Sequence, residues 1–331
     1  MGSSQLRDHG NFRAFSLLLR LAASLDFDHL RICDMYQEFY GLQRNPFDIT
    51  PDPRFFFATP RHNEALANLS YGIRWRKGFV VLTGEVGTGK TLLLRCLLDL
   101  LKHVQIASAY IVNTRLTAAE FLRHTVNDLQ VPTQTSDKSE LLQNFNRFLV
   151  QRCQRGSTTV LIVDEAHLLD WDVLEEIRLL GNLETAQEKL LQVVLVGQPE
   201  LDRNLDSPQV RQLKQRIMLR CKLEPLRNQE IRPYIERRLF LAGRKADAIL
   251  FSDSAVELIY EYSNGIPRVI NMICENALVV GCAQHTHSIK PPIVEEVASD
   301  FHLKRAQAIA GQAEATEDST GGVTSATAAV S

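Results

Sequence analysis

Cysteine pairs with the spacing of metal ligands are missing from this sequence. Its six cysteines contain no C-x-x-C pair, and they lie too far apart for a zinc site or for the scaffold of a small disulfide-rich protein. They are Cys33, Cys96, Cys153, Cys221, Cys274 and Cys282. We expect reduced, mostly buried thiols, as is usual for proteins of the cytoplasm.

Long hydrophobic runs and a large net charge are also missing. No run approaches the ~20 apolar residues that a membrane-spanning helix needs. The apolar stretch at 15–25 is interrupted by Arg20, which argues against a signal peptide for export. The net charge is −2, so the chain as a whole is not held to nucleic acid by charge, although local basic patches remain an option. With 331 residues and 45% hydrophobic content, we expect a globular cytoplasmic protein without a membrane span.

One stretch does carry a specific motif. Residues 79–91 read F-V-V-L-T-G-E-V-G-T-G-K-T and fit G-x-x-x-x-G-K-[ST], between a strand-like apolar run and a helix-like run at 92–101. The glycines allow the loop N–H groups to face a phosphate chain, and the following helix adds the positive end of its dipole. A glycine-rich turn with a solvated lysine is the weaker alternative, because strand, loop and helix coincide here.

This loop predicts the ligands of ATP and Mg²⁺. Lys90 supplies a mobile positive charge for the β- and γ-phosphates, and Thr91 supplies a hydroxyl for the metal ion. The predicted cradle consists of Gly84, Glu85, Val86, Gly87, Thr88, Gly89, Lys90 and Thr91.

Strands and helices alternate around this loop. Strand-like runs at 107–113, 158–163, 191–196 and 218–223 are separated by helix-like runs at 117–130, 137–155 and 171–183. This pattern predicts an α/β fold in which helices cover both faces of a parallel sheet, with 218–223 as an edge strand. Four helix-like runs follow, at 229–241, 254–262, 268–283 and 292–308. They predict a small all-α lid domain.

The chain therefore divides into four predicted parts. They are an extension at 1–34, a nucleotide-binding α/β domain at 35–227, the helical lid at 228–305 and a tail at 306–331. The extension precedes Met35, where the sequence resembles a fresh start, so it is either disordered or a misassigned beginning. The tail is rich in Ala, Thr, Ser and Gly, and we expect it to be disordered.

Two carboxylates, those of Asp164 and Glu165, follow the apolar strand-like run at 158–163. We predict that Asp164 binds the Mg²⁺ shell and that Glu165 acts as the general base toward the attacking water. We expect this strand to lie beside the strand that leads into the phosphate loop. A solvated helix start is the alternative for an isolated Asp-Glu pair. The four letters Asp-Glu-Ala-His, which end at His167, also name a helicase class, but four letters alone are weak evidence.

Three further side chains complete the predicted site. Gln198 follows the strand 191–196 and is expected to hold water or to sense the γ-phosphate; the alternative is a loop glutamine bonded to the backbone. Arg216 is the candidate arginine finger inserted from a neighbouring subunit, with Arg211 in reserve. Arg268, after a Gly-Ile-Pro turn in the lid, is predicted to touch the γ-phosphate; a surface arginine at a helix start is the alternative.

The arginine-rich run at 203–245 allows a second interpretation. A solvated helix face with ion pairs is the ordinary one. Nucleic-acid binding is the less favoured one, because the run lacks interleaved aromatic residues and a groove-reading module.

Taken together, these motifs resemble the AAA+ ATPases in order: Walker A, Walker B, sensor 1, arginine finger and sensor 2. Five segments are similar to the ATPase domain of the general secretion pathway protein A (ExeA) family, in a short form similar to the pilus protein MshM. The segments lie at 35–42, 46–55, 78–91, 177–185 and 195–201. His167 replaces the glutamine that this family usually carries.

The resemblance implies an ATPase that serves a bacterial envelope machine, such as type II secretion, a type IV pilus or polysaccharide and protein export. It implies a homo-oligomer, as a ring or filament. Longer members carry a transmembrane helix and a peptidoglycan-binding region, which we do not find in this sequence, so we expect contact with the inner membrane through a partner protein. More distant relatives assist DNA transposition, which keeps a DNA-dependent ATPase as the alternative function.

Overall fold

The computed structural model describes residues 32–305, except 49, 103–105, 113–114, 134, 136 and 246–248. Contacts divide the chain into two units. One unit is Pro51–Pro225, and the other joins the chain up to Thr50 with Leu226 onward. The predicted tail at 306–331 and nearly all of the predicted extension at 1–34 lie outside the described residues.

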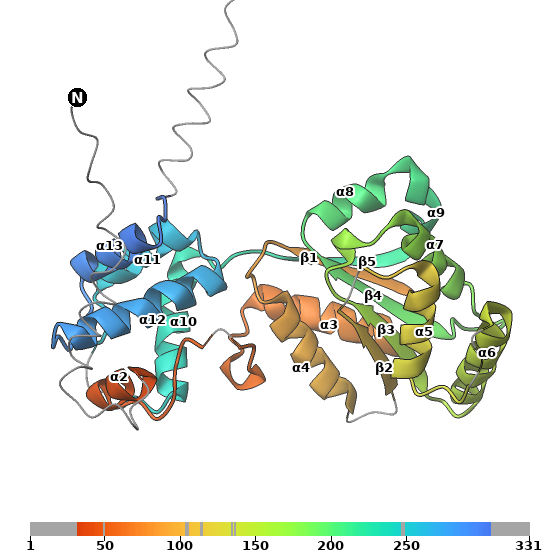
Figure 1. Cartoon of the computed structure of the whole chain (residues 1–331), viewed down its shortest axis with the longest axis horizontal. Helices are drawn as coiled ribbons and strands as arrows, with labels where there is room; N and C mark the ends of the chain where they lie inside the picture. The colour runs from red at the N-terminus through yellow and green to blue at the C-terminus, as the bar shows by residue number, and fades with distance from the viewer. Residues whose placement is uncertain are drawn as a thin grey trace, which may run out of the picture. The chain divides into compact units, whose positions relative to one another are not determined.

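The unit Pro51–Pro225 contains a five-stranded sheet in which all neighbouring strands are parallel. The strands are β1 (Phe79–Gly84), β2 (Ile106–Ile111), β3 (Thr158–Val163), β4 (Leu191–Gly197) and β5 (Ile217–Leu223). Their order across the sheet is β2-β3-β4-β1-β5, so β5 is an edge strand, as the sequence predicts (Figure 1).

One sequence-based expectation about this sheet is wrong. The strand β3, which ends before Asp164, does not lie beside β1, because β4 separates them. Leu195 of β4 pairs with Val81 of β1 on one side and with Val163 of β3 on the other. All three strands are fully buried apolar runs. Their hydrophobic pattern therefore contains no information about which of them are neighbours, and side-chain packing in the folded state decides it.

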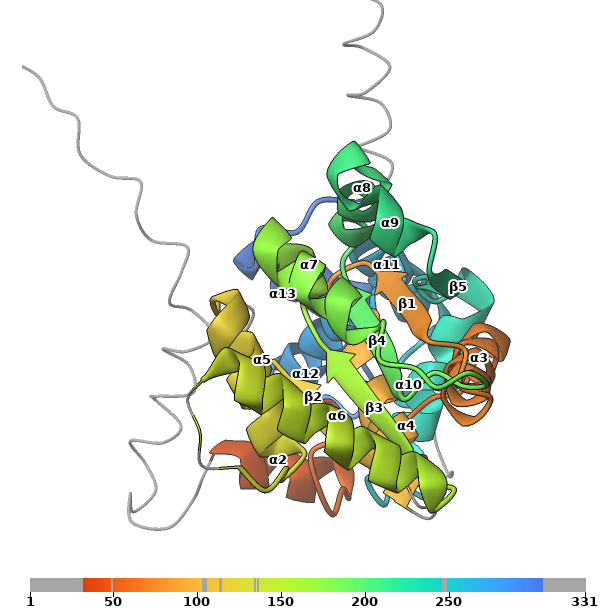
Figure 2. The same ribbon diagram turned by 90° about the vertical axis from the view of Figure 1, so that its right-hand side faces the viewer.

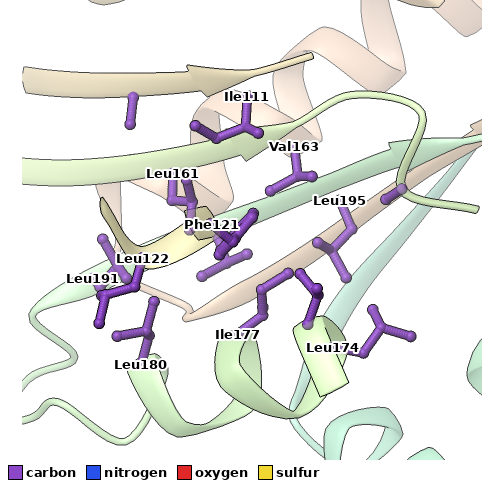
Figure 3. Packing of buried hydrophobic residues seen from close by; sticks show 14 of the residues in the cluster. Ile111, Phe121, Leu122, Leu161, Val163, Leu174, Ile177, Leu180, Leu191 and Leu195 are labelled. Atoms are coloured by element: carbon purple, nitrogen blue, oxygen red, sulfur yellow. The ribbon is translucent and has the colours of Figure 1, made fainter. Parts of the chain in front are cut away.

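Helices cover both faces of the sheet, and the central strands alternate between the two cores (Figures 1 and 2). The helices are α3 (Pro60–Arg74), α4 (Lys90–Lys102), α5 (Ala118–Asp128), α6 (Lys138–Gln154), α7 (Trp171–Leu180), α8 (Glu200–Asp206) and α9 (Arg211–Lys214). Leu161 and Val163 of β3 pack with α5, α6 and α7, whereas Val160 and Ile162 pack with α3 and α4. In Figure 3, Leu174, Ile177 and Leu180 of α7 point toward the strands. An unbroken apolar strand is thus buried on both faces.

Local sequence signals set several of the helix ends. Thr117 and Glu120 form the predicted capping box of α5, and Asp137 caps α6. The helix α7 ends at Leu180, before the expected 183. At the next position, Gly181, a Cβ atom would lie 2.3 Å from the ring of Phe79, so only glycine allows this close approach to β1.

The second unit consists of helices. They are α2 (Ile32–Tyr40), α10 (Asn228–Leu241), α11 (Asp253–Ser263), α12 (Pro267–Ala283) and α13 (Pro291–Asp300). Four of them correspond to the predicted lid helices, and the last ends at Asp300, where the sequence pattern suggested 308. None of the helices in the described part of the chain is both long and apolar enough to cross a membrane.

The segment before Thr50 packs with these helices, whereas the sequence division began the α/β domain at 35. Glu275 of α12 accepts hydrogen bonds from the Tyr36 hydroxyl and from Nδ2 of Asn45, both at 2.8 Å. Nε of Arg238 donates to the Pro46 carbonyl oxygen at 2.6 Å. These contacts join residues that are more than 190 positions apart along the chain, which no local pattern reveals.

Candidate active site

The phosphate loop connects the end of β1 to the start of α4. Gly87 and Gly89 adopt φ values of 82° and 98°, which L residues with a side chain rarely adopt. At Gly84 a Cβ atom would lie 2.7 Å from the Leu223 carbonyl oxygen. The three glycines of the motif therefore each meet a backbone requirement that another residue would not.

Lys90 is buried at the first turn of α4, with 6% of its surface exposed. Its Nζ atom donates hydrogen bonds to the carbonyl oxygens of Gly84 at 2.7 Å and Glu85 at 3.0 Å. Burial lowers the pKa of Lys90, while the carboxylates of Glu165 and Asp164 oppose this shift. The lysine is thus a cation held in a partly desolvated loop, where a phosphate group would compensate its charge.

Asp164 lies buried at the end of β3 and collects three hydrogen bonds. Its Oδ2 atom accepts from the Thr91 hydroxyl at 3.3 Å and from the Tyr110 hydroxyl at 2.8 Å, and its Oδ1 accepts from the Glu165 backbone N–H at 2.9 Å. Burial, followed by the charge of Asp164, raises the pKa of Tyr110, so this phenol stays a neutral donor. A hydroxyl and a carboxylate close together are the hard oxygen donors that suit Mg²⁺, so the residues present fit that ion.

Glu165, the predicted base, has an unusual backbone and an unusual carboxylate. Its φ of 53° and ψ of 33° place it in the left-handed region, which costs of order 1–3 kcal/mol in a residue other than glycine. Its Oε2 atom is buried and has no hydrogen-bond partner within the described part of the chain. Nδ1 of His167 lies 3.4 Å from this oxygen. Such strain and such an unsatisfied oxygen are typical of a functional position.

His167 connects this carboxylate to the end of β4. Its side chain is 7% exposed. The backbone N–H of Gln198 points at its Nδ1 atom from 3.5 Å, and Nδ2 of Asn204 donates to its carbonyl oxygen at 3.0 Å. The strands β1, β3 and β4 are parallel neighbours, so their carboxyl ends lie at the same end of the sheet. Gln198 follows β4 at that end, which also carries the phosphate loop after β1 and Asp164 after β3. The structure thus brings Lys90, Thr91, Asp164, Glu165 and Gln198 to one edge.

Arg216 lies at the opposite end of the same sheet, where the strands β1 and β5 begin. It precedes β5, whose first residue, Ile217, pairs with Phe79 at the start of β1. The strand β5 has seven residues, or about 23 Å of extended chain at ~3.3 Å per residue. Nη1 of Arg216 donates to the Arg178 carbonyl oxygen at 2.9 Å, and Arg211 is exposed. Arg216 thus lies at the end of β5 away from the phosphate loop, and a role of Arg216 or Arg211 at the nucleotide of a second copy stays a prediction.

Arg268 lies in the helical unit, in the first turn of α12, and is exposed. The preceding Gly265 has a φ of 73°, and a Cβ atom there would lie 1.9 Å from the Leu226 carbonyl oxygen. Its own carbonyl oxygen accepts a hydrogen bond from the Leu226 N–H at 2.8 Å. The Gly-Ile-Pro turn before α12 is therefore hydrogen-bonded to Leu226, where the chain re-enters the helical unit. The role of Arg268 at the nucleotide stays a prediction.

Two residues near the loop were missed at the sequence level. Tyr110 looked like an ordinary strand aromatic, and its position one strand away from Asp164 becomes visible only from the pairing of β2 with β3. His62 is buried, bonds through Nδ1 to the Thr59 hydroxyl at 2.6 Å, and has its Nε2 atom 3.9 Å from where a Cβ of Gly89 would lie. The signal for His62 was a polar residue on the buried side of the helical apolar pattern at 61–72.

The arginines of the 203–245 run contact groups of this chain. Arg220 pairs with Asp202 at 2.8 Å, and Arg232 pairs with Asp253 at 2.5 Å. Arg238 is buried and bonds to the Tyr234 hydroxyl at 3.0 Å. Arg203 pairs with Glu200 at 2.6 Å. The run is also divided between the two units, so it does not form a single basic face within either of them.

Comparison with known proteins agrees with this geometry. Residues 73–205 match a family model described as an AAA domain. General secretion pathway protein A of Aeromonas hydrophila is 44% identical over 256 residues, which cover 77% of this chain and 46% of that protein. The chain thus spans less than half the length of this relative.

Solved structures with the same fold have low sequence identity. Cdc6p from Pyrobaculum aerophilum matches with a TM-score of 0.59 and 18% identity, covering 77% of this chain and 70% of that chain. The ORC2 protein of Aeropyrum pernix matches with a TM-score of 0.60 and 17% identity, covering 78% and 72%. Drosophila ORC bound to DNA matches with a TM-score of 0.60 and 18% identity, covering 88% and 74%. At these identities the likeness concerns the fold alone.

Proposed function

The chain belongs to the AAA+ P-loop ATPases related to general secretion pathway protein A, and we propose that it hydrolyses Mg·ATP to ADP and phosphate to remodel or assemble a partner complex. The observation that carries this proposal is that Lys90, Asp164 and Glu165 lie close together where the parallel strands end. They come from three elements, α4, the end of β3 and the turn after it. A phosphate-binding protein without turnover does not need the carboxylate of Glu165.

Each residue has a distinct task in this proposal. Lys90 leaves its carbonyl partners and binds the β- and γ-phosphates, while the loop N–H groups orient the phosphate chain. Thr91 and Asp164 hold Mg²⁺, which neutralises phosphate charge when it is bound. Glu165 accepts a proton from the attacking water, and its Oε2 atom supports this role because it is buried and accepts no hydrogen bond from the described residues, with Nδ1 of His167 at 3.4 Å. Gln198 orients that water or contacts the γ-phosphate.

We further propose a homo-oligomer, a ring or a filament, in which Arg216 completes the site of a neighbour. Its position at the edge away from the phosphate loop supports an action in trans. We propose that the partner is an inner-membrane protein of a secretion, pilus or export system, which would keep this chain cytoplasmic and peripheral. The similarity to general secretion pathway protein A supports this choice of pathway class.

Paired variants test the activity. Lys90→Ala is expected to lose ATP binding, whereas Glu165→Gln is expected to keep binding and lose turnover by roughly 10²- to 10⁴-fold. Binding is measured with a fluorescent ATP analogue and turnover by phosphate release. Equal turnover of Glu165→Gln and the parent chain would remove Glu165 as the base, and no turnover in the parent chain would indicate a nucleotide-dependent scaffold.

Adding double-stranded DNA distinguishes the proposed function from the alternative, a DNA-dependent ATPase. An ATPase that assists transposition or replication is stimulated by DNA, with a steep salt dependence that follows from phosphate contacts. We expect turnover of this chain to be unchanged by DNA, because several arginines of the basic run already pair with carboxylates.

A further inference from the structure

Three side chains from three elements meet beside the end of β3. Tyr110 of β2 is paired in register with Ile162 of β3, and Asp164 follows Ile162 by two positions. Residues two positions apart along a strand point to the same face of a sheet. Tyr110 and Ile162 pack with the core on the face that α4 covers, and Thr91 lies in the first turn of α4. The fold thus places Thr91, Tyr110 and Asp164 on one face of the sheet.

Tyr110 makes the shorter of two hydrogen bonds to the same carboxylate oxygen. Its hydroxyl donates to Oδ2 of Asp164 at 2.8 Å, whereas the Thr91 hydroxyl donates to this atom at 3.3 Å, which is longer than an ordinary O–H···O bond. Asp164 is only 3% exposed, so water has little access to replace a lost donor. A buried carboxylate that loses a donor is costly to leave unsatisfied. Tyr110 therefore contributes most to the orientation of Oδ2.

The backbone that carries Tyr110 is itself held on both sides of β2. The Tyr110 N–H donates to Oδ2 of Asp128, the last residue of α5, at 2.6 Å. On the other side, the carbonyl oxygen of the next residue, Ile111, accepts a hydrogen bond from the Asp164 N–H at 2.9 Å. The phenol thus extends from a fixed point of the edge strand to the side chain of Asp164. A group held in this way is suited to orient another one.

Packing alone does not require a hydroxyl at this position. A phenylalanine ring would fill the same space against the core, so the oxygen of Tyr110 is the part that needs another explanation. Carboxylates that bind metal ions are commonly oriented by hydrogen bonds from an outer layer of side chains, and loss of such a bond typically weakens metal binding 10- to 100-fold. The bond between Tyr110 and Asp164 has this form.

We propose that Tyr110 is a positioning residue, which holds Asp164 in the orientation that binds Mg²⁺ and so sets how strongly the metal ion and the nucleotide bind together. The longer Thr91 bond is the one that a metal ion replaces, and the Tyr110 bond persists. This inference rests on the proposed function, because it concerns the metal site of that ATPase. Tyr110 lies on β2 and not on the phosphate loop, so its effect falls on the metal ion and not on the phosphate chain.

Tyr110→Phe tests this role, because it removes one oxygen atom and keeps the ring. A fluorescent ATP analogue that is not hydrolysed is bound to the full chain, first in EDTA and then in excess Mg²⁺, and its Kd is measured by fluorescence anisotropy. We expect the Kd in EDTA to equal that of the parent chain. The factor by which Mg²⁺ tightens binding should be about tenfold smaller in Tyr110→Phe, or should vanish.

Two further variants separate this role from a general loss of a hydroxyl. The matched control is Tyr262→Phe in the helical unit, where the Tyr262 hydroxyl also donates to a carboxylate, that of Glu295, at 2.6 Å. It should leave the Mg²⁺ factor unchanged. In an Asp164→Asn background, Tyr110→Phe should change the factor by less than about twofold, because Tyr110 acts through Asp164.

Several results would overturn the proposal. They are an unchanged Mg²⁺ factor in Tyr110→Phe, a parent chain whose analogue binding is indifferent to Mg²⁺, and a further tenfold loss in the Asp164→Asn background. Weaker binding of Tyr110→Phe in EDTA with an unchanged Mg²⁺ factor would reduce Tyr110 to a packing residue. Because the analogue is not hydrolysed, a chain that shows the expected Tyr110 effect but releases no phosphate from ATP would contradict the proposed hydrolysis alone.

Discussion

The Nδ1 atom of His167 lies 3.4 Å from Oε2 of Glu165 and 3.5 Å from the backbone nitrogen of Gln198. A single ring nitrogen accepts from the Gln198 N–H when it is unprotonated and donates to Glu165 when it carries a proton, but it does not do both at once. His167 is thus able to orient Glu165 in one form and to hold the end of β4 in the other. It connects the predicted base to the predicted sensor.

A positioning role for His167 predicts graded effects of substitution. His167→Leu removes the imidazole that lies 3.4 Å from Glu165 Oε2 and should lower kcat about ten- to hundredfold, with little change in KM for ATP. His167→Gln should recover most of the activity, because its amide both donates and accepts. Steady-state phosphate release measures both variants. Full kcat in His167→Leu, or equal losses in both, would reduce His167 to a packing residue.

Burial of Lys90 predicts how stability depends on pH without nucleotide. The pKa of Lys90 is lowered in the folded chain from its ordinary 10.5. The unfolded chain therefore binds more protons between the two pKa values, and the free energy of unfolding rises with pH in that window. Below both values the full cost of burying the charge is present. Denaturant unfolding at several alkaline pH values should show that the free energy of unfolding rises more steeply with pH in the parent chain than in Lys90→Met. Saturating ATP should abolish this difference. The same pH dependence in both chains without ATP would contradict the prediction.

The opposite-edge position of Arg216 predicts complementation between subunits. Arg216→Ala should lower turnover by about 10²-fold or more while ATP binding persists, and Lys90→Ala alone should be inactive. Mixing the two should restore part of the activity, because some interfaces then combine an intact Lys90 with an intact Arg216. Turnover is followed at a constant total concentration, with Arg211→Ala as the comparison. Mixtures that assemble but stay inactive would exclude an action of Arg216 in trans.

The close contact at Gly265 predicts a large loss of stability on substitution. In Gly265→Ala the new Cβ meets the Leu226 carbonyl oxygen at 1.9 Å in addition to the strain of a φ of 73°, so we expect a loss above ~3 kcal/mol. Gly41→Ala is the matched control in the same unit, since Gly41 has a φ of 66° with nothing within 4 Å of a Cβ. It should cost about 1 kcal/mol. Urea unfolding measures the loss in the free energy of unfolding for both variants. Similar losses would mean that the backbone around Leu226 shifts at little cost to make room for the Cβ atom.

Local chemistry explains which parts of the fold were predictable. The phosphate loop, the capping box at Thr117 and the apolar runs within β3 and β4 depend on residues close together in the chain. Their spacing alone indicates strand, loop and helix. The parallel sheet with helices on both faces and the four later helices follow from the same periodicity, and the structure confirms them.

The order of the strands and the partners of the site residues depended on the tertiary structure. β4 separates β1 from β3, because these buried strands have similar apolar patterns and choose neighbours through side-chain packing. Tyr110 reaches Asp164 from β2, the edge strand beside β3. The segment before Thr50 joins the helical unit through Glu275 and Arg238, which are distant in sequence. The sequence by itself determined which residues are predicted to bind phosphate and metal, since that prediction depends on particular side chains at short spacing. Only the folded chain decided that Glu165 faces His167 and that Arg216 lies at the far edge of the sheet, because those positions result from long-range packing.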